Sequence, residues 1–267
     1  LLAILIFLIV YIFFESLFHN KRLKHIPYRI HVNGTRGKSS VARLIGAGLR
    51  AGGIATSTKT TGTLPRFIDP SGKETPIYRP GHTNVIEQLK VVKWALMHKS
   101  KALVIECMAV QPLLQSLCEL KIVQSTHGVL TNARADHLDV MGPTEADVAL
   151  ALAATVPVKG IYFTPEEKYL ETFKMAIADR DSKLEHISEA DIEAITKQDL
   201  EGFSYQEYAS NVALALKVCQ SLGVEKSVAL KGMHQAIPDP GALSVYTYMD
   251  PKSGKTIYFA NGFAAND

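Results

Sequence analysis

Short apolar runs alternate with segments of helical periodicity along most of the chain. The apolar runs have the length of buried strands and predict strands at residues 28–32, 54–58, 102–107, 128–132 and 160–164. After the first strand, Val41, Leu44, Ile45, Gly48 and Leu49 share one face of a predicted helix that ends at Gly52 and Gly53. Further helices are predicted at residues 85–99 and 208–222. This alternation is typical of βαβ units, so we expect an α/β fold with a doubly wound, mostly parallel sheet.

The first residues differ from the rest of the chain. Residues 1–14 are all apolar or aromatic, and Lys21, Arg22 and Lys24 follow them. About 18 apolar residues suffice to cross a bilayer, and basic residues favour the cytoplasmic side. We therefore predict a single-pass membrane anchor at residues 1–18 and a basic linker at 19–28, with the remainder in the cytosol. A buried N-terminal helix and a signal-peptide core are the alternatives.

The other end of the sequence has the pattern of a strand at residues 256–261 followed by a loop at 262–267. We expect one ATP-binding domain over residues 29–260. We also expect residues 261–267 to begin a C-terminal portion that is missing from this sequence.

Composition limits the functional classes. The chain has 267 residues, of which 47% are hydrophobic, which is enough to bury a sizeable core. A formal charge of +3 gives no reason to expect a nucleic-acid partner. The 3 cysteines contain no C-x-x-C pair, so neither a disulfide framework nor a cysteine zinc site is indicated.

A glycine-rich turn joins the first predicted strand to the first predicted helix. Its residues are Asn33, Gly34, Thr35, Arg36, Gly37, Lys38, Ser39 and Ser40. A helix N-terminus at this point offers unpaired N–H groups to a phosphate, Lys38 can neutralise the phosphates, and Ser39 can bind Mg²⁺. Val32 stands where the usual P-loop has glycine, so the match is incomplete. The alternative is an ordinary glycine-rich turn.

Polar residues at the ends of two other strands suit a metal. Glu106 closes an apolar strand, where an acid is costly to bury without a cation. Asn132, Asp136, His137 and Asp139 follow the strand at 128–132, and a neutral His137 can bind a second Mg²⁺. The alternatives are a glutamate that emerges into water and a structural histidine.

Taken together, the loop GTRGKSS, the strand-end Glu106 and the T-N-x-x-x-D-H segment resemble the ATP-dependent Mur ligase superfamily, which includes folylpolyglutamate synthase. More closely, six stretches resemble the ligase subunits of poly-γ-glutamate synthases (PgsB/CapB type). They are NGTRGKSSVARL, KTTGT, ECMAVQP, DHLDVMGPT, KGMHQAIPDPGA and NGFAAND. The likeness covers nearly the whole chain.

The resemblance implies a reaction and a set of roles. ATP would phosphorylate a carboxylate of a glutamate chain, and the amine of an incoming glutamate would attack the acyl phosphate. Lys38 would contact the phosphates, Ser39, Glu106 and Thr61 would hold one Mg²⁺, and His137 would hold a second. Asn132 and Asn211 would lie on the nucleotide side. Small membrane proteins that hold and export the polymer are the implied partners.

Two departures from the wider Mur ligase pattern leave parts of the site open. Residues 145–158 contain no lysine to match the carbamylated lysine of that family, and residues 237–242 lack its usual arginine. Arg79, His82 and Asn84 are candidates for binding a carboxylate-rich substrate, or they only solvate a loop.

Three functions remain open from the sequence. The leading one is a membrane-anchored ligase that makes poly-γ-glutamate with ATP and Mg²⁺. A Mur-type cell-wall or folylpolyglutamate ligase would instead use one dedicated acceptor. A non-catalytic ATP-binding scaffold of a membrane complex would bind nucleotide without turnover.

Overall fold

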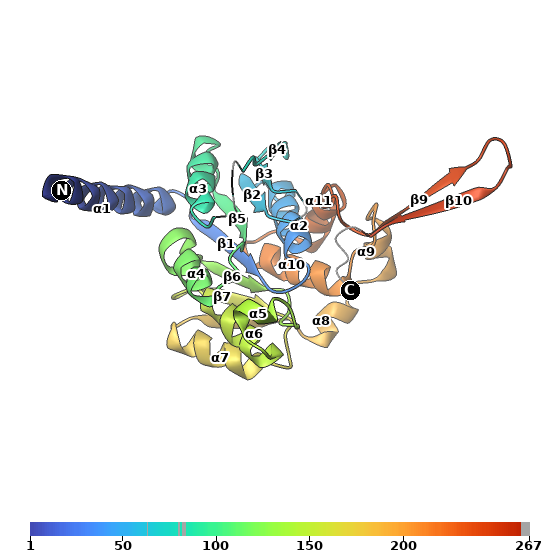
Figure 1. Cartoon of the computed structure of the whole chain (residues 1–267). Coiled ribbons are helices and arrows are strands. Elements are labelled where there is room, and N and C mark those ends of the chain that lie inside the picture. Colours follow the sequence, from blue (N-terminus) through green and yellow to red (C-terminus); the bar gives the residue numbers. More distant parts are fainter. Residues whose placement is uncertain (63, 80, 82–83, 263–267) are drawn as a thin grey trace.

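The computed structural model describes residues 1–62, 64–79, 81 and 84–262. Its centre is an 8-stranded sheet in the order β4-β3-β2-β5-β1-β6-β7-β8, and helices cover both faces (Figure 1). The strands β2, β5, β1, β6, β7 and β8 are parallel, whereas β3 and β4 form an antiparallel edge. The expected α/β fold with a doubly wound, mostly parallel sheet is confirmed.

The strands are β1 (Tyr28–Asn33), β2 (Thr56–Thr60), β3 (Arg66–Ile68), β4 (Glu74–Pro76), β5 (Ala102–Glu106), β6 (His127–Leu130), β7 (Ile161–Thr164), β8 (Lys183–His186), β9 (Ser244–Met249) and β10 (Thr256–Asn261). The α-helices are α1 (Leu2–Lys24), α2 (Lys38–Ala51), α3 (Glu87–Met97), α4 (Pro112–Leu117), α5 (Leu138–Met141), α6 (Glu145–Leu152), α7 (Leu170–Asp179), α8 (Glu189–Glu193), α9 (Lys197–Glu201), α10 (Ala209–Ser221) and α11 (Lys226–His234). A π-helical turn follows α4 (Cys118–Val123), and a 3₁₀ turn follows α6 (Ala153–Thr155).

The central strands are apolar throughout because both of their faces are buried. On β5, Ala102 and Val104 pack in the core beneath α2, α10 and α11, whereas Leu103 and Ile105 pack on the opposite side with α3. Successive side chains of a strand point to opposite faces, so this alternation follows from the pleat. A third cluster joins α6 and α7 to β6 and β7.

The predicted elements lie close to the observed ones. Strand β2 begins at Thr56, two residues later than expected. Strands β3, β4, β8 and β9 were not predicted. Asn211 lies in the first turn of α10, which begins at Ala209, close to the predicted start at residue 208.

Helix α1 is long and apolar enough to cross a membrane, by length and composition alone. Most of it extends away from the sheet, but its last turns are attached to the body (Figure 1). His19 Nε2 lies 2.7 Å from the carbonyl oxygen of Ile122, and Leu23 is buried. Arg29 donates hydrogen bonds to the carbonyls of Leu23 and Ile26 at 3.2 and 2.8 Å. The junction between α1 and β1 is therefore held by side chains as well as by the backbone.

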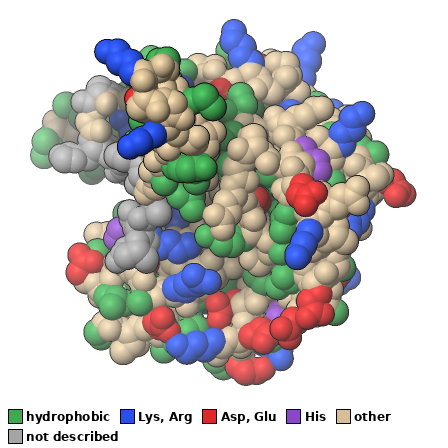
Figure 2. Space-filling view, turned by 90° about the vertical axis from the view of Figure 1, so that its right-hand side faces the viewer, with side chains coloured by type: hydrophobic (Ala, Val, Ile, Leu, Met, Phe, Trp, Pro, Cys, Tyr) green, Lys and Arg blue, Asp and Glu red, His purple; other side chains and the backbone are tan. Residues whose placement is uncertain are grey.

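Strands β9 and β10 form a separate antiparallel hairpin that projects from the body (Figure 1). The strand predicted at residues 256–261 is confirmed, and it pairs with β9 instead of joining the main sheet. The large apolar side chains of the hairpin are exposed: Val245, Tyr246, Tyr248, Met249, Ile257, Tyr258 and Phe259. Figure 2 shows the side of the molecule from which the hairpin projects, and this side carries both acidic and basic side chains.

Candidate active site

The glycine-rich turn between β1 and α2 has a backbone that requires glycine at two positions. Gly34 has a φ of +131° and Gly37, which precedes α2, has a φ of +80°. A Cβ on Gly34 would lie 2.0 Å from Thr131 Oγ1 and 3.0 Å from the Thr131 amide nitrogen. A side chain at position 34 is therefore excluded by both strain and space. We call residues 33–40 the phosphate loop.

The segment after β6 supports the phosphate loop. Asn132 Oδ1 accepts hydrogen bonds from Thr35 Oγ1 at 2.6 Å and from the Arg36 amide at 3.2 Å. Asn132 Nδ2 donates back to the Arg36 carbonyl at 3.1 Å, and Thr131 Oγ1 donates to the same carbonyl at 2.6 Å. The structure thus places Asn132 against the loop, where its side-chain amide holds the Thr35 hydroxyl and the Arg36 backbone.

Asn33 is directed into the interior. Its side chain is buried, and Nδ2 donates to Gln115 Oε1 at 2.8 Å and to Thr155 Oγ1 at 3.1 Å. These hydrogen bonds connect the start of the loop to α4 and to the 3₁₀ turn that follows α6. The sequence prediction placed Asn33 in the nucleotide site, and in the structure its amide has a supporting position.

Lys38 and Ser39 begin α2. The Lys38 ammonium donates to the carbonyls of Gly34 at 2.7 Å and Thr35 at 3.1 Å, so it folds back over its own loop. Ser39 Oγ donates to Glu106 Oε2 at 2.8 Å. Ser40 lies beside Ser39 and is half-buried. The lysine, the hydroxyl and the acid therefore gather at the N-terminus of one helix, which attracts anions.

Glu106 reaches this position because β5 runs parallel to β1, with Glu106 in register with Val32. Its side chain is only 3% exposed, and Oε2 also accepts a hydrogen bond from the Thr61 amide at 2.5 Å. Both of these donors are neutral, and in the described part of the chain no basic side chain forms an ion pair with Glu106, although the buried Lys59 is near enough to interact with its charge. A buried carboxylate beside a hydroxyl fits a hard divalent cation such as Mg²⁺. Thr61 contacts Glu106 through its main-chain amide, and its role as a metal ligand stays a prediction.

His137 occupies the rim of the site. Its backbone is left-handed, with a φ of +46°, and its side chain is 53% exposed. Asp136 Oδ1 lies 3.9 Å from His137 Nε2 and 3.9 Å from Arg36 Nη2, so Asp136 stands between His137 and the phosphate loop. Within the described ranges, no group of three or more His, Cys, Asp or Glu side chains could hold a metal. A second metal at His137 stays a prediction.

Asn211 lies beside the phosphate loop, on α10. A Cβ on Gly37 would lie 3.1 Å from Asn211 Oδ1, and Asn211 Nδ2 donates to Glu207 Oε1 at 2.8 Å. The amide is thus oriented by Glu207, with its oxygen toward the loop. Sequence reasoning missed Glu207, because only the packing of α10 against the loop reveals it.

The proposed substrate residues make local contacts. Arg79 forms two hydrogen bonds with Glu87, at 2.6 and 3.0 Å, and the fully buried Lys59 lies 3.1 Å from the same carboxylate. Burial alone would raise the pKa of Glu87, but Arg79 and Lys59 bring it below its usual value. Asn84 Oδ1 accepts a hydrogen bond from the Ile86 amide at 3.0 Å. His82 lies outside the described residues.

Gly62 and Asp239 lie in stretches that carry the family resemblance, but sequence reasoning gave neither of them a role in the site. A Cβ on Gly62 would lie 2.5 Å from Asp239 Oδ2 and 2.6 Å from Ser39 Oγ. Asp239 is 8% exposed, and in the described part of the protein its Oδ2 has no hydrogen-bond partner. An acid from the end of the α/β domain therefore faces the start of α2, although it is 200 positions from Ser39 in the numbering.

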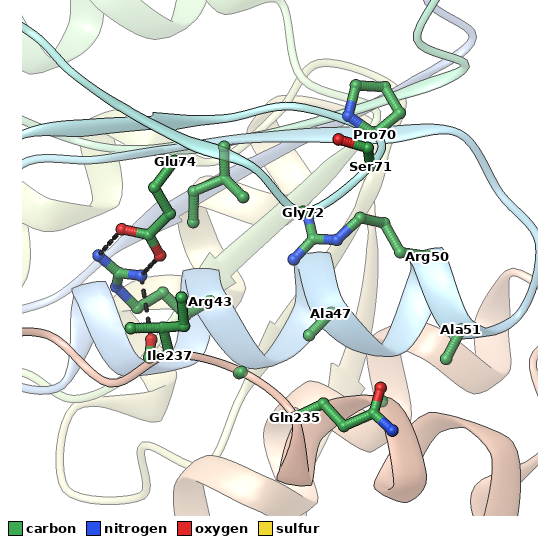
Figure 3. A pocket seen from close by; sticks show the side chains of 13 residues that line it. Arg43, Ala47, Arg50, Ala51, Pro70, Ser71, Gly72, Glu74, Gln235 and Ile237 are labelled. Carbon is green, nitrogen blue, oxygen red and sulfur yellow. Dashed lines mark hydrogen bonds and ion pairs between the residues drawn. The ribbon is translucent and has the colours of Figure 1, made fainter.

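A cavity of about 440 Å³ lies along α2, between that helix, the β3–β4 edge and α11 (Figure 3). Its lining includes Arg43, Arg50 and Gln235. Arg43 is 2% exposed; it pairs with Glu74 and donates to the Ile237 carbonyl at 3.0 Å. The cavity is separate from the phosphate loop, and its arginine links α2 to the segment that leads to Asp239.

Comparison with known proteins gives the family. A sequence model described as the Mur ligase middle domain matches residues 32–237. The chain therefore belongs to the Mur ligase family, a family of ATP-dependent amide ligases.

Among curated relatives, the chain is 42% identical over 264 residues to the capsule biosynthesis protein CapB of Bacillus anthracis. This match covers 98% of this chain and 56% of that protein. It is 39% identical over 251 residues to the PGA synthase CapB of Bacillus subtilis strain 168, covering 93% of this chain and 63% of that protein. The chain thus spans little more than half the length of the curated relatives that it matches.

The fold is also that of solved folylpolyglutamate synthases. The bifunctional folylpolyglutamate synthase/dihydrofolate synthase of Yersinia pestis CO92 superposes with a TM-score of 0.64 at 17% identity, covering 86% of this chain and 62% of that one. A bifunctional synthase with Mn, AMPPNP and L-glutamate bound gives a TM-score of 0.62 at 17% identity, covering 86% and 63%. At this identity the likeness concerns the fold.

Proposed function

We propose that this chain is the ATP-binding part of a membrane-anchored, Mg²⁺-dependent amide ligase that extends poly-γ-glutamate. The observation that carries the proposal is the meeting of Lys38, Ser39 and Glu106 at the start of α2. The relatives named for capsule biosynthesis and PGA synthesis supply the product class.

The carboxylate of the growing chain has no leaving group, so it must be activated before an amide bond can form. A carboxylate oxygen of the growing chain attacks the γ-phosphorus of ATP, ADP leaves, and an acyl phosphate forms. The uncharged amine of an incoming glutamate then attacks the acyl carbon, the amine loses its proton, and phosphate leaves with the C–O bond electrons. One amide bond forms for each ATP consumed. Positioning and charge neutralisation supply most of the catalysis in such transfers.

The residues of this chain contribute to binding and orientation. Lys38 turns from the carbonyls of Gly34 and Thr35 to the phosphates, which offer it stronger, charged acceptors. Asn132 holds the loop backbone in place while phosphate is bound. Ser39 and Glu106 would hold Mg²⁺, which neutralises charge on the phosphate oxygens when bound.

We further propose that α1 anchors the protein. It ends in Lys21, Arg22 and Lys24, which favours a cytoplasmic position for everything after it. The catalytic domain would then work on cytosolic glutamate and ATP, and small membrane proteins would receive the polymer. Extraction of membranes with alkaline carbonate should leave the protein in the pellet, and release into the supernatant would contradict the anchor.

Membranes carrying the protein, supplied with ATP, Mg²⁺ and labelled L- or D-glutamate, test the activity. We expect a ladder of γ-linked oligomers with release of phosphate. A single adduct to one acceptor would instead indicate a cell-wall or folate ligase. Nucleotide binding without glutamate-stimulated phosphate release would indicate a scaffold, and either result would overturn the proposal.

A further inference from the structure

Asp239 lies in the segment between α11 and β9, and it meets the phosphate loop only in the folded chain. Asp239 Oδ2 and Ser39 Oγ flank one point, since both lie within 2.6 Å of a Cβ placed on Gly62. Ser39 Oγ is in turn 2.8 Å from Glu106 Oε2. Carboxylate oxygens of Asp239 and Glu106, from separate parts of the chain, therefore both lie close to Ser39 Oγ.

The two oxygens of Asp239 have different surroundings. Oδ1 accepts a hydrogen bond from the Gly241 amide at 3.0 Å, which forms a tight turn. Oδ2 is buried and has no hydrogen-bond partner among the residues that the structure describes. Burying a carboxylate oxygen without a partner costs free energy. Its position beside Ser39 therefore indicates a partner that arrives with the ligand.

The segment that carries Asp239 is fixed relative to Ser39. Arg43, one helical turn after Ser39 on α2, donates to the Ile237 carbonyl at 3.0 Å (Figure 3). The Ala242 amide donates to the Asp239 carbonyl at 2.8 Å. Because the same helix presents Ser39 and holds the segment at Ile237, the acid keeps its place beside the hydroxyl.

We propose that Asp239 is a third oxygen donor to the divalent cation held by Ser39 and Glu106, a role that rests on the function proposed above. Mg²⁺ prefers hard oxygen ligands and keeps several waters, so Asp239 reaches it directly or through one of those waters. A second carboxylate also strengthens the attraction of the site for a dication at short range. In this role Asp239 would make metal binding depend on the position of the segment between α11 and β9.

Mn²⁺ binding measured by electron paramagnetic resonance, with the full chain in detergent and saturating AMPPNP, tests the role. Asp239→Asn keeps the Oδ1 acceptor of the turn and removes the charge, so we expect at least about a tenfold weaker Mn²⁺ affinity. Asp239→Ser, which also supports such a turn, should give the same result if Asp239→Asn unfolds. Asp250→Asn changes an acid in the turn of the β9–β10 hairpin and should leave Mn²⁺ binding unchanged.

Glu106→Gln separates failure of this inference from failure of the proposed function. If Glu106→Gln weakens Mn²⁺ binding and the Asp239 variants do not, Asp239 is no ligand and the proposed site stands. If none of them changes Mn²⁺ binding, both proposals are overturned.

A measurement on the unmodified protein gives an independent result. Fe²⁺ placed in the site, with ascorbate and peroxide, cleaves the backbone close to the metal. We expect cuts near Ser39, near Glu106 and within residues 238–240. Cuts at the first two without the third would overturn the role of Asp239.

Discussion

Ser39 Oγ and Glu106 Oε2 lie 2.8 Å apart, although 67 positions separate the two residues in the sequence. The parallel pairing of β1 and β5 brings them together, because the carboxyl ends of neighbouring parallel strands share one edge of the sheet. The contact joins the helix proposed to receive phosphate to the acid proposed to hold the accompanying Mg²⁺.

Glu106→Gln should abolish ligation without unfolding the protein. The amide oxygen still accepts from Ser39 and Thr61, but the negative charge is lost. We expect glutamate-stimulated phosphate release to fall by about a hundredfold or more, with an unchanged melting temperature. The exposed Glu201→Gln is the control. Full activity in Glu106→Gln would show that the acid has no part in the reaction.

Lys38→Ala should remove the charge that faces the phosphates. Because Lys38 is half-buried and its ammonium bonds just two loop carbonyls among the residues that the structure describes, its loss should cost little stability. ATP turnover should fall by about a hundredfold or more, since charge stabilisation of this kind is worth several kcal/mol. Lys174→Ala, at an exposed helical pair, serves as the control. Unchanged ATPase activity with glutamate present would place the phosphate site elsewhere.

Arg43→Leu should be strongly destabilising. The change removes the buried partner of Glu74, which then keeps the longer contact of 3.9 Å with Arg66, and it frees the Ile237 carbonyl. Removing one member of a buried ion pair costs about 3–5 kcal/mol, measurable as the free energy of unfolding in urea. The double variant Arg43→Leu with Glu74→Leu should recover most of the loss. Arg134→Leu, at an exposed position, should cost little, and a similarly small cost for Arg43→Leu would contradict the predicted importance of the pair.

His127 should make the protein sensitive to acid. Burial, with a contribution from Arg29, lowers its pKa to about 4, below the value of about 6.5 expected in the unfolded chain. Between these values the folded state binds fewer protons, so the free energy of unfolding falls as the pH drops from about 6.5 to 4, by about 3 kcal/mol in all.

The comparison with His127→Phe isolates this effect. His127 stacks on Phe163 with ring centroids 6.0 Å apart, a contact that phenylalanine can keep. Urea unfolding of both proteins at pH 7 and pH 4 should show the extra loss only in the unmodified chain. Equal losses in the unmodified chain and in His127→Phe would contradict the assignment.

Much of the fold was predictable from local patterns. The buried parallel strands β1 and β5 are short apolar runs, and α2 shows a regular apolar face, so period and length identified them. The edge strands β3 and β4 have three residues each, too few to establish a period. The pairing of β3 with β2 and of β4 with β3 is a tertiary effect that no local pattern contains.

The site was predictable only where its residues carry a local signal. Lys38 and Ser39 belong to a recognisable loop, and Glu106 is an acid at the end of an apolar strand. Asn33 belongs to the same loop, yet Gln115 and Thr155 bind its amide from distant segments. Asp239 lies in a Pro-Asp-Pro-Gly turn that any surface loop could contain, so only its burial next to Ser39 distinguishes it.

With α1 in a membrane, as proposed above, the short connection from α1 to β1 would also set the height of the phosphate loop above the bilayer. Only His25, Ile26 and Pro27 separate the two elements, and the bonds from Arg29 hold the joint. Strand β1 then spans about 20 Å before the phosphate loop begins. With α1 embedded, bound nucleotide would lie at a fixed distance from the lipid headgroups. Bond formation would then occur at a fixed distance from the membrane proteins proposed to receive the polymer.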